Sequence, residues 1–240
     1  MLLTFISRET LLEALPKGLV CGEIGTAVGD FAQQILDRAA PTRLHLIDPW
    51  RHIDVPEYQL DSNNVDDAEG QRRYESVCAR FDRHAANGQV VIHRALSVQE
   101  ADSFPDNYFD FVYIDGDHTK PAVAADLRAF DRKVKPQGLI MGHDYVTHPN
   151  FIAKSFGVVE AVNEFVRETG YEFLMLTYEG SPTYVLAKQQ NSPLALRLAS
   201  YLLGAMVPIV VIEDAENKSM GQWDVLDEGG KRLRTLLAFR

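Results

Sequence analysis

Short apolar runs alternate along most of this sequence with longer segments of helical apolar spacing, and this alternation restricts the fold more than any other feature. The runs that indicate strands cover residues 19–24, 44–47, 89–93, 109–114 and 139–141. Helical spacing is found over residues 30–40, 71–84 and 123–134. A strand, a helix and a second strand in succession form a βαβ unit, in which the two strands are parallel. The sequence therefore predicts an open parallel sheet with helices on its faces.

The pattern changes in the last third of the chain. An amphipathic helix over 158–169 is followed by strand-like runs over 171–177 and 183–187, which the turn at 179–182 joins into a hairpin. The expected fold class is α/β. It comprises a Rossmann-like, doubly wound, mostly parallel seven-stranded sheet that closes with an antiparallel hairpin, and a small α/β C-terminal extension.

Two segments fall outside this regular pattern. The polar stretch from Arg51 to Gly70 has no apolar period, and a loop of this length is usually functional or disordered, so we expect residues 51–73 to form a lid insertion. A solvated surface loop is the other interpretation. We place a catalytic domain at residues 1–188 and an extension at 189–240. The apolar helix at 194–203 needs a partner surface, which leaves dimerisation, covering of the site, and packing on the core as its roles.

Composition excludes several classes of protein. Hydrophobic residues form 46% of the chain and charged residues 24%, as in globular proteins. The net charge of −10 offers no basic field to a nucleic acid. Cys21 and Cys78 belong to no paired motif, which indicates a reducing compartment. The chain start lacks the basic region of a signal peptide, and no apolar stretch is long enough to span a bilayer. We therefore expect a cytoplasmic protein without membrane contacts.

Acidic residues follow the apolar runs at the points where strands should end. The strand-end motifs are Glu23-Ile-Gly25, Ile47-Asp48, Ile114-Asp115-Gly116-Asp117 and Gly142-His143-Asp144. Ligands of open parallel sheets bind beyond the carboxyl ends of the strands, so these groups should converge on one crevice. Each motif alone is weak evidence for a ligand site, and the expected convergence of all four is the stronger evidence.

The first strand leads into a loop that holds Gly25, Thr26 and Gly29 before a helix begins. Gly25 permits positive φ and close approach of a ligand, and the helix start presents free N–H groups. The loop lacks the G-x-G-x-x-G pattern, and Glu23 would repel a pyrophosphate, whereas a ligand with an amino-acid end and a sulfonium suits an acidic rim. A plain tight turn is the competing interpretation.

Asp48 stands at the tip of the second strand, where a carboxylate can accept both hydroxyls of a ribose. A turn residue before Pro49 is the competing interpretation. Trp50 can stack on a base edge, although a tryptophan more often packs in a core or a lid.

These residues and the closing hairpin resemble a class I S-adenosylmethionine-dependent methyltransferase. The segment that includes Asp115-Gly-Asp117-His118 and Gly142-His143-Asp144-Tyr145 is similar to the methyltransferase-24 group, which contains macrocin-type sugar O-methyltransferases and, more distantly, catechol O-methyltransferases. The resemblance covers residues 18–188. Residues 189–240 resemble no family that we can name.

The resemblance implies roles for individual residues. Residues that would contact S-adenosylmethionine are Glu23, Gly25, Thr26, Gly29, Asp48, Ser97 and Asp115, with Asp48 at the ribose and Ser97 near the adenine. In the metal-dependent relatives, Mg²⁺ or another divalent cation would bind at the positions of Asp115, His143 and Asp144. Asp117 is the implied general base.

His143 departs from the metal-dependent relatives, because an acidic residue or an amide is usual near this position. Imidazole suits Mn, Fe, Ni or Zn better than Mg²⁺, which prefers oxygen ligands. Asp115 and Asp144 could hold Mg²⁺ with water as the third ligand. Alternatively, the site contains no metal and His118 or His143 is the base. A purely structural role is the competing interpretation of His118, in which the residue stands at a helix start and its ring hydrogen-bonds to the backbone.

The sequence as a whole favours methylation of an oxygen on a small hydroxylated metabolite, a sugar or a natural-product intermediate. An NAD(P)-dependent oxidoreductase and a non-catalytic binding or assembly protein are the alternatives. The missing G-x-G-x-x-G argues against the first, and the aspartates and histidines at the strand ends argue against the second. The expected partners are a small-molecule acceptor and other copies of the chain, in a homodimer or a higher homo-oligomer.

Overall fold

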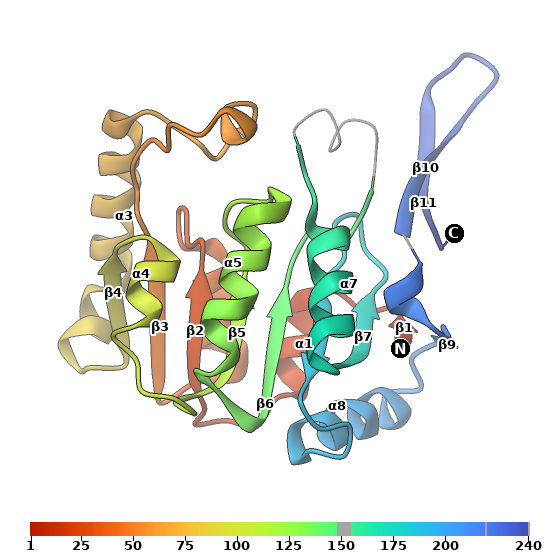
Figure 1. The fold of residues 1–240 in the computed structure, drawn as a ribbon, viewed down its shortest axis with the longest axis horizontal. Helices are drawn as coiled ribbons and strands as arrows, with labels where there is room; N and C mark the ends of the chain where they lie inside the picture. Colours follow the sequence, from red (N-terminus) through yellow and green to blue (C-terminus); the bar gives the residue numbers. More distant parts are fainter. Residues whose placement is uncertain (148–154, 219, 240) are drawn as a thin grey trace.

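The computed structural model describes residues 1–147, 155–218 and 220–239. They form one nine-stranded sheet and one two-stranded sheet (Figure 1). The strands of the large sheet are β1 (Leu2–Thr4), β2 (Val20–Ile24), β3 (Arg43–Asp48), β4 (Val90–Arg94), β5 (Phe109–Ile114), β6 (Val134–Gly142), β7 (Glu172–Thr177), β8 (Tyr184–Ala187) and β9 (Ile209–Val211). The small sheet pairs β10 (Met220–Leu226) with β11 (Arg232–Phe239).

The strand order of the large sheet is β4-β3-β2-β5-β6-β8-β7-β1-β9. Neighbours are parallel except where β8 or β9 takes part, so the sheet is mostly parallel and β7 and β8 form the predicted antiparallel hairpin. The predicted α/β fold class is confirmed. The strands β1 and β9 extend the sheet beyond the seven expected strands, with β9 at its edge. No strand was predicted at the position of β1.

Helices cover both faces of the large sheet, as a doubly wound fold requires. The helices are α1 (Arg8–Ala14), α2 (Asp30–Gln34), the π-helix η1 (Ile35–Ala39), η2 (Pro56–Tyr58), α3 (Asp67–Ala86), α4 (Ser97–Ala101), α5 (Lys120–Asp131), α7 (Val158–Thr169), α8 (Pro193–Gly204) and η3 (Ala215–Asn217). One apolar core includes residues of α4, α5 and α7, and a second includes residues of α1, α2, η1, α3 and α8. Successive residues of β5 alternate between them: Val112 belongs to the first core and Tyr113 to the second.

Capping residues explain two helix starts that lie earlier in the chain than the apolar period indicates. The Asp66 carboxylate accepts a hydrogen bond from Glu69 N, so α3 begins at Asp67 instead of residue 71. Pro121 lies in the first turn of α5, which begins at Lys120. The non-helical part of the expected lid therefore ends at Asp66.

The C-terminal extension packs on the same body. Leu198 and Leu202 of α8 are 1% exposed in the second core, and Arg197 Nε donates to Ala14 O at 2.9 Å. The strand β9 lies beside β1 at the sheet edge, and the β10–β11 hairpin stands apart from the large sheet (Figure 1). None of the helices that the structure describes combines the length and the apolar character needed to cross a bilayer.

Candidate active site

A cavity of about 360 Å³ lies at the carboxyl ends of the parallel strands, where β2 and β5 meet and the chain order of the sheet reverses. Ligands of open α/β sheets bind at such a switch point, and the volume is in the range of small-molecule sites. Of the residues that the sequence singled out, the lining includes Gly25, Asp48, Trp50, Ser97, Asp115 and Asp117. The segment 51–73, which we expect to be a lid, contributes Arg51, Ile53, Tyr58, Asn63, Asn64, Val65, Gly70 and Arg73. Glu23, Thr26, Gly29, His118, His143 and Asp144 are not part of the lining.

The glycine loop brings the ends of β2 and β5 into close approach. Gly25 has φ +86°, and a Cβ at this position would lie 2.2 Å from Asp115 O. Gly29 also has positive φ, but a Cβ there would meet the Phe81 ring of α3 at 2.8 Å. Gly25 is therefore required at the cavity wall, whereas Gly29 serves the packing of α3.

Glu23 of β2 is 2% exposed and precedes Ile24 and Gly25, which line the cavity. Among the described residues, its Oε2 and the hydroxyl of Thr26 are buried side-chain atoms without a hydrogen-bond partner. Burial, together with the nearby Asp115 and Asp48, raises the pKa of Glu23 well above its ordinary value. A positively charged ligand in the cavity would relieve the repulsion among these three carboxyl groups.

Asp48 ends β3 and is fixed by the backbone around it. Its Oδ2 accepts a hydrogen bond from Ala27 N at 2.9 Å, and its Oδ1 accepts one from Trp50 N at 2.7 Å. Burial raises the pKa of this carboxyl above its ordinary value. Each carboxylate oxygen can accept two hydrogen bonds, so Asp48 both shapes the turn and retains acceptor capacity toward the cavity.

Trp50 packs as a wall of the cavity. The ring is 3% exposed, and its Nε1 donates to Ala27 O at 2.7 Å. This hydrogen bond ties the residue after β3 to the glycine loop after β2.

Ser97 begins α4, and its hydroxyl donates to Asp126 Oδ1 of α5 at 2.5 Å. Both residues line the cavity. The sequence predicted Ser97 near the adenine and missed Asp126. The signal was present, because Asp126 lies on the face of α5 that also carries the buried Val123, Leu127 and Phe130.

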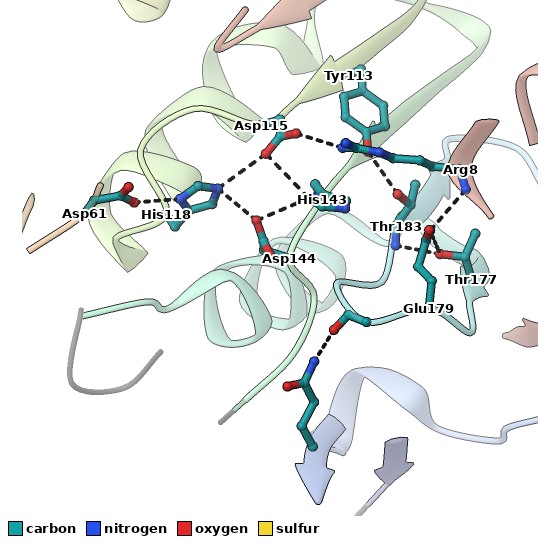
Figure 2. A network of polar contacts seen from close by, with 12 residues as sticks. Arg8, Asp61, Tyr113, Asp115, His118, His143, Asp144, Thr177, Glu179 and Thr183 are labelled. Atoms are coloured by element: carbon teal, nitrogen blue, oxygen red, sulfur yellow. Dashed lines mark hydrogen bonds and ion pairs between the residues drawn. The ribbon is translucent and has the colours of Figure 1, made fainter. Parts of the chain in front are cut away.

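A cluster of ionisable groups lies beside the cavity (Figure 2). His118 Nε2 is 3.0 Å from Asp144 Oδ2 and 3.4 Å from Asp115 Oδ1, while its Nδ1 is 3.0 Å from Asp61 Oδ2 of the lid segment. His143 Nδ1 is 3.2 Å from Asp144 Oδ2 and 3.7 Å from Asp115 Oδ1. The segments after β5 and β6 therefore bring together Asp115, His118, His143 and Asp144. Asp61, from the segment expected to be a lid, joins them through His118.

The carboxylates determine the charge of the two imidazoles. Burial opposes the charged form of His118, but hydrogen bonds with Asp115, Asp144 and Asp61 outweigh it and raise the pKa of His118 well above its ordinary value. The pKa of His143 is raised in the same way, mainly by Asp144 after the opposing effect of burial. The surrounding carboxylates thus favour the charged form of His118, and its role as the base remains a prediction.

The same cluster can be tested for a divalent cation. One ligand atom each from Asp115, His118 and Asp144 lie within 4.8 Å of one another. His118 supplies the imidazole of this group, and His143 lies next to Asp144. Two carboxylates and an imidazole fit Mn, Fe, Ni or Zn better than Mg²⁺. The expected set of Asp115, His143 and Asp144 remains a prediction.

Arg8, at the start of α1, adds a positive charge to the cluster. Its Nη1 donates to Asp115 Oδ2 at 3.0 Å and to the Tyr113 hydroxyl at 3.3 Å (Figure 2). The guanidinium lies 4.4 Å above the Phe31 ring. The sequence analysis did not single out Arg8, because α1 precedes the first βα unit and nothing local indicates that it reaches the end of β5.

Asp117 faces the cavity from the loop between β5 and α5. Its Oδ1 accepts a hydrogen bond from Thr119 N at 2.8 Å, which orients the carboxyl at the start of α5. Burial raises its pKa above the ordinary aspartate value. A raised pKa makes the carboxylate a stronger base than an ordinary aspartate, which suits the general-base role expected of Asp117.

Comparisons with known proteins identify a family and a fold. A family model described as a methyltransferase domain, Methyltransf_24, matches residues 22–145. No curated protein sequence matches the chain. N-methyltransferase NodS from Bradyrhizobium japonicum is similar in structure, with a TM-score of 0.51 and 14% identity, over 75% of this chain and 93% of NodS.

A second similar structure is that of a possible exported protein from Bordetella parapertussis, with a TM-score of 0.51 and 14% identity over 75% of this chain. The match spans 65% of the Bordetella protein. At these identities the structures establish a shared fold alone. The family model covers more than half of the chain, including the glycine loop and the strand ends at Asp48, Asp115 and Asp144. The chain therefore belongs to the Methyltransf_24 family of methyltransferase domains.

Proposed function

We propose that this chain is an S-adenosylmethionine-dependent methyltransferase that methylates an oxygen of a small hydroxylated acceptor, a sugar or a natural-product intermediate. The observation that carries the proposal is the cavity at the switch point, which Gly25, Asp48 and Ser97 line together with Asp117. The volume suits a nucleoside-sized ligand. The acidic surroundings favour a cationic ligand over a pyrophosphate, which supports the sulfonium cofactor over NAD(P).

The residues present fit the cofactor. The buried Glu23, whose pKa is raised by burial and by Asp115 and Asp48, supports an acidic environment next to the cavity that suits a cationic ligand. In the proposed complex Asp48 binds the ribose hydroxyls, and the close approach at Gly25 keeps the loop backbone out of the cavity. The cavity remains open beneath the lid segment, so nothing here supports the non-catalytic alternative.

The chemistry requires alignment and removal of a proton. When bound, S-adenosylmethionine supplies a methyl group on a positively charged sulfur, and a divalent cation at Asp115 and Asp144 supplies a Lewis acid for the acceptor oxygen. Asp117 would accept the proton of the acceptor hydroxyl and so make the acceptor oxygen a nucleophile for the methyl group that the cofactor would supply. The lid segment orients the acceptor and excludes water, which favours in-line displacement.

Isothermal titration calorimetry with S-adenosylmethionine and S-adenosylhomocysteine tests the cofactor. We expect both to bind, NADH not to bind, and Asp48→Asn to weaken binding by about tenfold or more, because a hydrogen bond to a charged group is lost. Asp54→Asn, at an exposed position outside the cavity lining, is the matched control. Absence of binding at millimolar cofactor would overturn the proposal.

A methyl-transfer assay with catechol and sugar acceptors tests the finer claims. Asp115→Ala and Asp144→Ala are expected to abolish transfer while calorimetry still detects cofactor binding. Exhaustive treatment with EDTA should also abolish transfer. Activity that survives EDTA unchanged would exclude the cation and leave the cofactor proposal intact.

A further inference from the structure

Asp126 is an acidic residue on the core-facing side of α5. It is 4% exposed, and its neighbours on that side of the helix are the apolar Val123, Leu127 and Phe130. An unpaired carboxylate in such surroundings is costly, so its presence needs a physical reason. Asp126 nevertheless belongs to the cavity lining, which gives its carboxyl group access to a ligand.

The two oxygens of Asp126 have different surroundings. Oδ1 accepts the short hydrogen bond from the Ser97 hydroxyl, and Ser97 is the one hydrogen-bond partner of Asp126 among the residues that the structure describes. Oδ2 lies on the side of Gly116, where a Cβ would be 3.9 Å away. Gly116 also lines the cavity. The carboxyl group is thus oriented through one oxygen and keeps the other for a ligand.

The charged groups around α5 do not compensate a negative charge at Asp126. Asp117, from the preceding loop, is a second acid, and Tyr184 of β8 is a buried phenol. On α4, Glu100 is paired with His93. The ion pairs between α5 and α7 are exposed: Lys120 pairs with Glu164, and Arg128 pairs with Glu168.

Burial raises the pKa of Asp126 to about 7, against the hydrogen bond from Ser97 and with a contribution from Asp117 in the same direction. A substantial fraction of the Asp126 carboxyl groups is therefore neutral near pH 7, and the neutral form predominates below it. A neutral carboxyl carries a donor beside an acceptor, whereas a carboxylate carries acceptors only.

We propose that Ser97 and Asp126 form a purine-reading pair, in which Asp126 as a neutral acid donates its proton in a hydrogen bond to a ring nitrogen of the cofactor's adenine. The adenine edge places an acceptor nitrogen beside an amine donor, which complements the donor and acceptor of a neutral carboxyl. This inference rests on the proposed use of S-adenosylmethionine. In this inference the selectivity for adenine comes from Asp126 on α5, which belongs to none of the strand-end motifs.

The test is calorimetric titration of S-adenosylhomocysteine from pH 6 to pH 9. Affinity in the wild type should be constant below about pH 7 and should then fall by up to about tenfold per pH unit, because the binding form of Asp126 is lost. Asp126→Asn keeps a donor beside an acceptor without a titrating proton, so it should bind with similar affinity at every pH. Asp117→Asn removes the neighbouring acid, so it should retain the decline but begin it at a lower pH.

S-inosylhomocysteine supplies a second readout that needs no variant. Its base presents a ring N–H where adenine presents an acceptor, so it should bind at least about tenfold more weakly than S-adenosylhomocysteine at pH 6. The difference should shrink above pH 7, where the carboxylate can accept that N–H. Equal pH profiles for the two ligands would overturn the inference, as would a wild-type affinity for S-adenosylhomocysteine that is constant to pH 9. Failure of S-adenosylhomocysteine to bind at any pH would instead refute the proposed function.

Discussion

At the scale of single residues, the site depends on how closely two strand ends approach. Gly25 and the backbone of Asp115 leave no space for a side chain, and Gly25 also has φ in the left-handed region. Gly88 has a similar φ of +76°, but no atom lies within 4 Å of a Cβ built there. The two glycines therefore separate the effect of backbone strain from that of steric exclusion.

Gly88→Ala should cost about 1 kcal/mol of unfolding free energy, the strain of an L-residue at positive φ. Gly25→Ala should cost about 3 kcal/mol or more, because the overlap with Asp115 is added to the same strain. Urea denaturation of both variants measures the difference. Equal losses would mean that the strand ends do not approach as closely as described.

A partly buried chain of polar side chains joins β3 and β4 to Glu100 of α4 and to Tyr108. His45 Nδ1 is 2.8 Å from His93 Nε2, His45 Nε2 is 3.0 Å from the Tyr108 hydroxyl, and His93 Nδ1 is 2.8 Å from Glu100 Oε1. Burial, with His93 and Arg43, lowers the pKa of His45 to about 4. The folded protein thus binds this proton less readily than the unfolded chain.

This lowered pKa predicts a pH dependence of stability. The contribution of neutral His45 is complete above pH 6.5 and is lost as the pH falls toward 4. His45→Gln should therefore lose about 1–2 kcal/mol less unfolding free energy than the wild type between pH 7 and pH 5. His52→Gln, at an exposed position, is the control and should follow the wild type. Parallel curves for His45→Gln and the wild type would refute the account.

At the scale of elements, segments outside the central βαβ units complete the site. Arg8 belongs to α1, before the span that the family model matches, and yet its guanidinium contacts Asp115. Asp61 comes from the lid segment and contacts His118. The chemistry of the strand ends therefore depends on how α1 and the lid pack on the sheet.

The helix α8 tests whether the C-terminal extension belongs to the same folded body. Leu198 is 1% exposed and Leu203 is 72% exposed on the same helix. Leu198→Ala should cost about 2–5 kcal/mol, as truncation of a core leucine does, and Leu203→Ala should change stability by less than about 0.5 kcal/mol. Thermal unfolding of the two variants provides the measurement. A small effect of Leu198→Ala would indicate that the extension folds apart from the domain.

At the scale of the whole molecule, local patterns predicted most of the sheet. The apolar runs that end at Ile24, Asp48 and Ile114 could be recognised as strands because a turn follows each of them. They form β2, β3 and β5, which are neighbours in the sheet. The three-residue strands β1 and β9 have no such pattern. The strand β1 forms by pairing with β7, a contact between residues more than 170 positions apart, and β9 then pairs with β1.

The site was predicted in part for the same reason. Gly25, Asp48, Asp115 and Asp117 follow strands directly, so the order of the strands brings them together. Arg8 and Asp61 come from elements whose packing no local pattern reveals. Asp126 was visible as a charge on the apolar face of a helix, and its proximity to Ser97 depends on the contact between α4 and α5.

The central claim is that the cavity between β2, β3 and β5 binds S-adenosylmethionine. A crystal structure of the chain grown with saturating S-adenosylhomocysteine tests it most directly. The account predicts density in the cavity, with the ribose at Asp48, the adenine against Ser97 and Asp126, and the sulfur toward Asp117. Density at another place on the molecule, or an empty cavity at saturating ligand, would contradict it.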